Sequence, residues 1–201
     1  MADRFNLEHS VSSLSRFLAA IWLGYLDLYR RIFGYLIKYP KRRYAIDPHP
    51  LTINADYDRF QMKYDFGNQY AYSSEDIGGE FPETLLGELE IHVFVIAYHR
   101  NDKVAGRSIN GGFSVVGSIA TTWSSKCQTA VQTSTFGAEF TEMKKSVKES
   151  VMLWYHLIKM GIKVPKPTPI FMDSMSVVLN ATNPGITLNN RIVVLSYHFV
   201  K

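Results

Sequence analysis

The stretch at residues 135–160 constrains the fold more than any other part of the chain, because its apolar side chains recur every three or four residues. At ~100° per residue, this spacing puts them on one face of a long helix. Gly161 follows directly, as expected for the glycine after a helix C-terminus. The predicted apolar face consists of Phe136, Phe140, Met143, Val147, Val151, Trp154 and Ile158. Such a helix must pack that face against another layer of the fold.

The residues before and after this helix predict strands. The predicted strands are residues 91–96, 111–117, 119–123 and 169–172. The first is apolar at nearly every position, as is typical of a strand buried on both faces. Shorter helices are expected at residues 174–181 and 189–201. This order predicts a three-stranded meander followed by a crossover helix into a parallel strand, and therefore an α/β fold.

Charge divides the chain of 201 residues into three parts. Residues 1–50 hold eight basic and four acidic side chains, residues 51–90 hold two and nine, and residues 91–201 hold twelve and five. The net charge of +4 favours a polyanionic partner. Pro48 and Pro50 mark a linker between the first two parts. The predicted regions are a helical segment at residues 1–44, an acidic linker or peripheral region at 45–89 and a folded domain at 90–201.

The N-terminal part predicts an amphipathic helix that packs on protein and does not cross a membrane. The apolar run at residues 17–26 is too short, because a spanning helix needs ~20 apolar residues. The helix carries apolar side chains at Tyr25, Leu28, Ile32, Tyr35 and Leu36, between charged residues. The chain lacks the pattern of a signal peptide, and its single cysteine, Cys127, fits a reducing compartment. We expect an intracellular protein, cytoplasmic or nuclear, with no membrane partner.

Two carboxylates are candidates for a metal site. Glu139 lies in the first turns of the long helix, about 60° around it from Phe136. Asp173 follows the predicted strand after that helix, so both can face one cleft. Paired carboxylates are what a Mg²⁺ site for phosphoryl chemistry requires. The alternative is that Glu139 is a solvated flank residue and that Asp173 caps the following helix.

Four sequence blocks together resemble the ribonuclease H domain of copia-type retrotransposon polyproteins. These are WSSKCQ at 123–128, STFGAEF at 134–140, FMDSMS at 171–176 and SYHFV at 196–200. Upstream, VSSLSRF at 11–17 and RIFGYL at 31–36 resemble the stretch that closes the reverse transcriptase domain of the same polyproteins. The resemblance covers most of residues 4–43 and 90–201.

The resemblance implies a ribonuclease H-like α/β fold, with a mixed five-stranded sheet and flanking helices, preceded by a short helical segment. It implies hydrolysis of the RNA strand of RNA–DNA hybrids with Mg²⁺ or Mn²⁺ held by four carboxylates. Glu139 matches the helix glutamate of the family and Asp173 its second aspartate, so these two are the expected catalytic and metal-binding residues. Ile96 and Tyr98 stand where the family has an Asp-x-Asp pair. The fourth carboxylate belongs beyond the last strand, so we expect a C-terminally truncated domain, since this chain ends at Lys201.

Other residues supply alternatives and further contacts. Asp102 is a candidate replacement ligand or an ordinary turn residue, and Glu142 is expected to be solvated. The candidate nucleic-acid contacts are Arg100, Lys103, Arg107, Lys126, Lys144, Lys145 and Lys148; the alternative for the helix lysines is a solvated face. No histidine pair has the spacing of a zinc site on a helix.

The predicted function is a retrotransposon-derived ribonuclease H-like domain with degenerate activity. The expected partners are an RNA–DNA hybrid or other nucleic acid and the upstream reverse transcriptase region of the same polyprotein. Two alternatives remain open: a catalytically inactive module that binds nucleic acid, and a relic without function.

Overall fold

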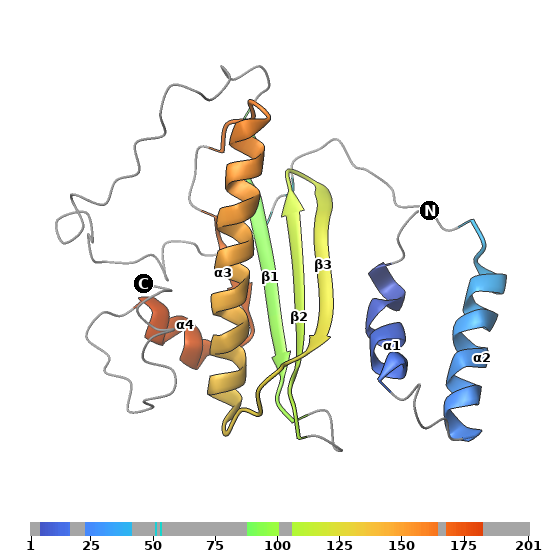
Figure 1. Ribbon diagram of the computed structural model, residues 1–201. Coiled ribbons are helices and arrows are strands. Elements are labelled where there is room, and N and C mark those ends of the chain that lie inside the picture. Colours follow the sequence, from blue (N-terminus) through green and yellow to red (C-terminus); the bar gives the residue numbers. More distant parts are fainter. Residues whose placement is uncertain are drawn as a thin grey trace.

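A computed structural model describes residues 5–16, 23–41, 51, 53, 88–100, 106–164 and 168–182 (Figure 1). The helices are α1 (Phe5–Ser15), α2 (Leu23–Lys38), α3 (Thr135–Lys159) and α4 (Met175–Thr182). The strands are β1 (Ile91–Tyr98), β2 (Ile109–Val116), β3 (Ile119–Cys127) and β4 (Ile170–Met172). The predicted helix at 189–201 and nearly all of the predicted acidic region at 45–89 lie outside the described residues.

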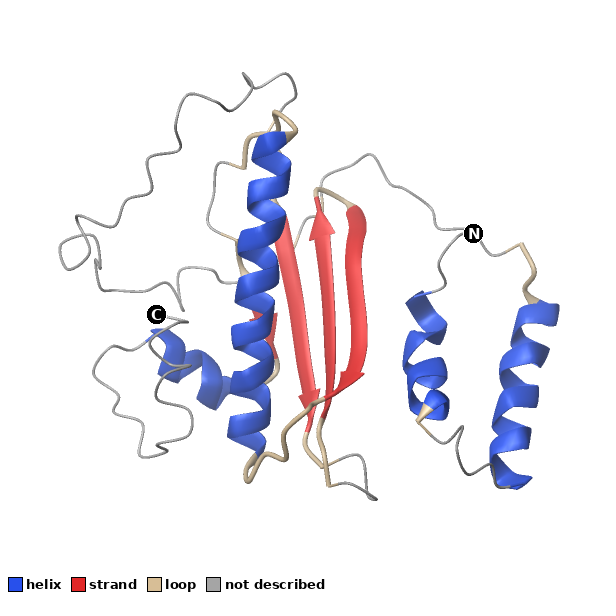
Figure 2. Ribbon diagram, viewed as in Figure 1, coloured by secondary structure: helices blue, strands red, loops and turns tan. Residues whose placement is uncertain are grey.

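The four strands form one mixed sheet in the order β3-β2-β1-β4. β1, β2 and β3 pair antiparallel as a meander, and β4 pairs parallel to β1 after the crossover through α3. Figure 2 shows α3 lying along one face of this sheet, with α1 and α2 on the side of β3. The predicted α/β class with a mixed sheet and flanking helices is therefore confirmed, and the arrangement is compatible with a ribonuclease H-like fold.

The long helix begins and ends where the sequence predicts. The Ser134 hydroxyl accepts a hydrogen bond from the Gly137 N–H and so caps the N-terminus of α3. At the other end Gly161 has a φ of 75°, a left-handed conformation that glycine adopts without strain. These two residues fix the length of α3 and therefore where the chain returns to the sheet.

The face that α3 buries differs from the predicted stripe. Its buried residues are Gly137, Ala138, Phe140, Glu142, Ser146, Ser150 and Leu157, whereas Val151 is 47% exposed. The sheet-facing row lies about 100° around the helix from the predicted face, roughly one residue. Part of the predicted stripe, Phe136, Phe140 and Met143, packs instead on Val177 of α4. Both the sheet and α4 cover parts of α3. The hydrophobic pattern alone therefore indicated the face that packs in part on α4 and missed the face that packs on the sheet.

β1 is buried on both faces only in its first half. Ile91, Val93 and Val95 pack with Val116 and Leu157 in the main core between the sheet and α3. On the other face, Ile96 is 51% exposed and Tyr98 is exposed too. The prediction of a strand buried on both faces is therefore wrong at the carboxyl end of β1. This end lies at the candidate site.

The N-terminal helices pack beside the sheet. α1 contacts β3, where a Glu8 carboxylate oxygen accepts a hydrogen bond of 3.1 Å from the Ser125 N–H on the edge strand. α2 contacts α1, and four of its five predicted apolar positions are half-buried, with Leu28 exposed instead. In the described part of the chain no helix combines the length and the apolar character that crossing a membrane requires.

Candidate active site

The carboxyl ends of β1 and β4 bring two predicted site positions together. The parallel register pairs Phe94 with Phe171 and Val95 with Met172. The next position on β1 is Ile96, and the next residue after β4 is Asp173. Both line the same pocket, and Asp173 is exposed. The sequence position that would carry an acid in the resembled family therefore lies next to Asp173 but holds a hydrocarbon side chain.

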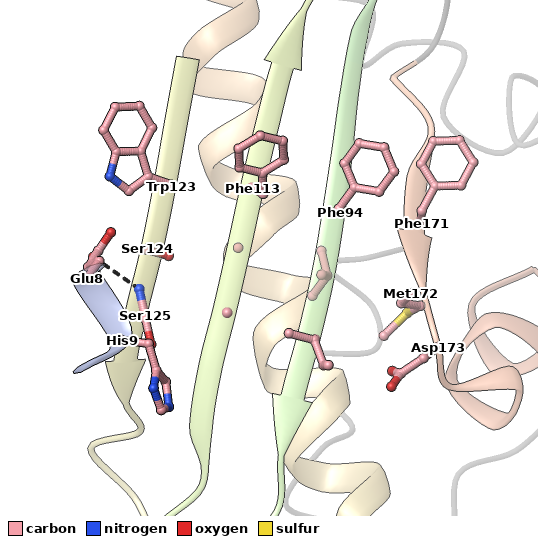
Figure 3. A pocket seen from close by; sticks show the side chains of 14 residues that line it. Glu8, His9, Phe94, Phe113, Trp123, Ser124, Ser125, Phe171, Met172 and Asp173 are labelled. Carbon is pink, nitrogen blue, oxygen red and sulfur yellow. Dashed lines mark hydrogen bonds between the residues drawn. The ribbon is translucent and has the colours of Figure 1, made fainter. Parts of the chain in front are cut away.

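This pocket has a volume of about 560 Å³ and opens on the face of the sheet away from α3 (Figure 3). Four aromatic residues cross it in one register, one from each strand: Trp123, Phe113, Phe94 and Phe171. The Phe94 and Phe171 rings stack with centroids 5.1 Å apart. The ionisable lining residues are Glu8, His9 and Asp173, and no lysine or arginine is among the described lining residues. The pocket is thus apolar and weakly acidic rather than suited to phosphate.

Gly111 makes room for the residue at position 96. It pairs with Ile96 across β1 and β2, and a Cβ built on Gly111 would come within 2.8 Å of the Ile96 side chain. Such a contact is closer than real side chains allow, so Ile96 lies over the bare glycine backbone. An aspartate at position 96 is smaller than isoleucine and would fit the same space.

Glu139 and Asp173 lie at the same end of the sheet. α3 begins at the edge where β1 ends (Figure 1), and Glu139 is half-buried in its second turn. Among the described lining residues of the pocket, however, Asp173 is present and Glu139 is absent.

The described residues do not fit a two-metal centre. Two Mg²⁺ ions ~3.5–4 Å apart need several carboxylate oxygens in near-octahedral geometry. Within the described ranges, no three His, Cys, Asp or Glu side chains lie close enough together to hold a metal ion. Ile96 and Met172 present carbon and sulfur beside Asp173 instead of oxygen. Asp102, the candidate replacement ligand, lies outside the described residues.

Three of the predicted nucleic-acid contacts gather near this end of the sheet. Arg100 follows β1, Arg107 precedes β2 and Lys126 is near the end of β3; all three are exposed. In the antiparallel register, Tyr98 pairs with Ile109 and Asn110 pairs with Lys126. The three basic residues therefore lie at the same end of the strands. Lys148 is exposed on α3 and Lys144 is half-buried there. Lys103 lies outside the described residues.

Lys145 forms ion pairs with two acidic side chains of α3. Its ammonium group lies 3.2 Å from a carboxylate oxygen of Glu142 and 3.7 Å from one of Glu149, and it donates to the Ser124 hydroxyl at 3.4 Å. A phosphate contact through Lys145 would have to compete with these partners.

The sequence prediction for Glu142 is wrong. This residue was expected in solvent, but its side chain is 0% exposed and lies between α3 and the sheet. The prediction followed the apolar stripe, whereas the sheet packs on the row that continues from Ala138. The Asn110 amide donates to one Glu142 oxygen and Lys145 donates to the other. Burial raises the pKa of Glu142 above its ordinary value of 4.5, and Lys145 opposes that rise.

Gln128 extends the buried network around Glu142. Its amide group donates to the side-chain oxygen of Asn110 and to the backbone carbonyl of Ala138, the latter at 2.8 Å. Gly112 lies next to Ser124, because a Cβ built on Gly112 would be 3.2 Å from the Ser124 hydroxyl. In the sequence, the only indication that Glu142 is buried is its four-residue spacing from Ala138. Because the residues of this network are polar, the hydrophobic pattern did not predict their burial.

Comparison with known proteins finds retrovirus-related Pol polyproteins from the transposons RE1 and RE2 of Arabidopsis thaliana. Both are 26% identical to this chain over 113 residues, which is 56% of this chain and 8% of each relative. The chain is similar to a segment of retrotransposon Pol polyproteins. It therefore spans a small part of the length of the curated relatives that it matches. No family model matches the sequence, and no solved structure matches it.

Proposed function

We propose that this chain is a ribonuclease H-like domain of a copia-type retrotransposon polyprotein, with the end of a reverse transcriptase before it. Its ancestral reaction is hydrolysis of the RNA strand of RNA–DNA hybrids, and its activity in this chain is degenerate. The observation that carries the proposal is the pairing of β1 with β4, in which Ile96 neighbours Asp173. Similarity to Pol polyproteins from two transposons supports the assignment to a retrotransposon polyprotein.

The chemistry of this pair explains the degeneracy. An aspartate at position 96 would supply negative charge and oxygen ligands at the carboxyl ends of two neighbouring parallel strands. Isoleucine supplies neither, and Mg²⁺ dehydrates reluctantly without a preformed set of oxygen ligands. Glu139 and Asp173 remain as the candidate metal-binding and catalytic residues, and their affinity for Mg²⁺ or Mn²⁺ is weak or lost.

Restoring the acids tests this proposal directly. The measurement is cleavage of an end-labelled RNA–DNA hybrid in Mg²⁺ or Mn²⁺ by the full chain and by a variant with Ile96→Asp and Tyr98→Asp. We expect metal-dependent cleavage by the double variant at least about tenfold above that of the unchanged chain. Adding Asp173→Asn to the double variant should abolish the gain.

A matched control separates charge from polarity. The variant with Ile96→Asn and Tyr98→Asn has similar side-chain size but lacks the carboxylates, so it should cleave no better than the unchanged chain. If the aspartate variant unfolds cooperatively, binds the hybrid and still does not cleave it, the ribonuclease H proposal is wrong. Strong cleavage by the unchanged chain that survives Asp173→Asn would also contradict it.

A second candidate function is an inactive module that binds nucleic acid. This function is favoured by three exposed basic residues at one end of the strands, Arg100, Arg107 and Lys126. Clustered cationic side chains of this kind recognise phosphates. Binding of a labelled hybrid should then weaken as salt rises, and a triple alanine variant should reduce that salt dependence. Absence of binding by a cooperatively folded chain would leave the relic alternative.

A further inference from the structure

The pocket on the face of the sheet away from α3 has an aromatic floor that the proposed reaction does not use. Each strand contributes one ring: Trp123, Phe113, Phe94 and Phe171. Because neighbouring strands lie ~4.8 Å apart, the row of rings extends roughly 14 Å across the sheet. The Phe94 and Phe171 rings are nearly parallel, with 19° between their planes. All four side chains are only half-buried, so a bound molecule can reach this floor (Figure 3).

A carboxylate lies at each end of the aromatic row. Glu8 of α1 lies beside Trp123, and Asp173 lies near Phe171 at the end of β4 (Figure 3). One Glu8 oxygen accepts a hydrogen bond from the Ser125 N–H, which fixes this carboxylate at the β3 end of the pocket. Asp173 is exposed at the other end. The apolar floor is therefore flanked by negative charge on both sides.

Charge and aromatic chemistry favour the same kind of ligand. Aromatic rings attract cations, because their π-electrons make the ring faces partly negative. The two carboxylates add to this attraction, and no lysine or arginine among the described lining residues opposes it; His9 is the remaining ionisable residue there. A planar cation such as an amidinium can stack on a ring and also donate N–H groups to a carboxylate. An anion would be repelled at both ends, and a neutral ring would gain only the stacking.

The dimensions of the pocket fit a small molecule. Its volume of about 560 Å³ lies within the range of ~300–1,000 Å³ that is typical of small-molecule sites. Phe171 and Asp173 both line it and are two residues apart, which corresponds to about 6.6 Å along an extended chain. This spacing suits an aromatic ring that carries an amidinium group, with the ring on Phe171 and the charge at Asp173.

We propose that this pocket binds a small planar organic cation, which stacks on Phe94 and Phe171 and pairs with Asp173. Glu8 at the far end strengthens the negative potential. The inference goes beyond the proposed function and does not depend on it, because binding requires neither a metal ion nor nucleic acid. Hybrid cleavage tests the proposed function and ligand binding tests this inference, so the failure of one is distinguishable from the failure of the other.

NMR titration of the full chain with three probes of similar size tests the charge preference. Benzamidine is a planar cation, benzamide is its neutral analogue and benzoate is an anion. At about pH 8, where histidine is ordinarily neutral, benzamidine should bind at least about tenfold more tightly than benzamide, and benzoate should not bind. The net charge of +4 works against nonspecific binding of cations. Equal binding of benzamidine and benzamide, or tighter binding of benzoate, overturns the proposal.

Two substitutions separate the charge from the stacking. Asp173→Asn keeps the side-chain size but removes the charge, so it should weaken benzamidine at least about fivefold and leave benzamide unchanged. Phe94→Leu should weaken both probes, since it removes a stacking ring. Asp27→Asn is the matched control, because Asp27 is an exposed acid on α2 that does not line the pocket, and it should change neither affinity. Urea denaturation checks that each variant unfolds cooperatively. A folded Asp173→Asn variant that binds benzamidine as tightly as the unchanged chain overturns the proposal.

The same titration tests two other occupants. Adenosine represents a neutral base that stacks on aromatic side chains, and a short arginine peptide represents a protein partner. Weaker binding of both than of benzamidine supports the proposal. Tighter binding of adenosine that is insensitive to Asp173→Asn would make the floor a base-stacking surface, and tighter binding of the peptide would make it a peptide-docking surface. Either result overturns the assignment to a small cation.

Discussion

The two halves of the contact between α3 and the sheet are built from different chemistry. Toward its C-terminus, α3 inserts Leu157 among Ile91, Val93 and Val95 of β1. Toward its N-terminus, the same helix buries the polar network of Glu142, Asn110 and Gln128. The contrast teaches that one helix can keep a continuous sheet-facing row while the free energy of burial changes along it.

The polar half is satisfied only in part. Glu142 has hydrogen-bond donors for both oxygens, but its charge is buried, which costs free energy that the Lys145 pair offsets incompletely. The Gln128 side-chain oxygen is buried and has no hydrogen-bond partner within the described residues. We therefore expect the apolar half to supply most of the stability and the polar half to set how stability depends on pH.

The largest expected effect is on the apolar half. Leu157→Ala should reduce the free energy of unfolding by about 3 kcal/mol, because it removes buried carbon and leaves a cavity. Urea denaturation followed by circular dichroism measures this loss. Val151→Ala is the control, since Val151 lies on the face predicted from the sequence but is exposed. It should change stability by less than about 0.5 kcal/mol, and equal losses would contradict the observed face.

A smaller loss is expected in the polar half. Asn110→Ala removes the amide that donates to Glu142 and the oxygen that accepts from Gln128, so two buried groups lose a partner. The free energy of unfolding should fall by about 2 kcal/mol in the same urea assay. Thr121→Ala on the exposed part of β3 is the reference substitution and should be near neutral. A neutral Asn110→Ala would show that the network contributes nothing.

The smallest effect should appear as a change in pH dependence. The pKa of Glu142 is raised in the folded state, mainly by burial, so folding favours its protonated form. Its contribution to stability is therefore present below the unfolded pKa of about 4.5 and is lost as pH rises through the folded pKa. Glu142→Gln cannot titrate, so its stability relative to the unchanged chain should increase as pH rises. Parallel stability curves between pH 4 and 8 would refute a raised pKa.

Much of the fold was predictable because it depends on local patterns. The strand character of β1, the end of α3 at Gly161 and the order of strands and helices all follow from neighbouring residues. The family resemblance marked positions 96, 98, 139 and 173 as one site, and strand pairing brings positions 96 and 173 together. α1 was missed as a separate helix, since its sequence has only a weak apolar stripe.

Other features could not be predicted because they depend on which partners meet. Glu142 is three residues from Glu139 on the same helix, yet one is fully buried and the other half-buried. The difference arises from Asn110 and Gln128, which come from β2 and the residue after β3. No pattern in the sequence of α3 indicates that these two residues lie beside Glu142.

The sequence by itself determined the α/β class, the long helix with its ends and the strand order along the chain. Only the tertiary structure decided which face of α3 meets the sheet, that Ile96 lies over Gly111 beside Asp173, and that Lys145 pairs with a buried acid. The physical reason is that secondary structure follows local propensity and periodicity, whereas burial and ion pairing are set by contacts between distant segments.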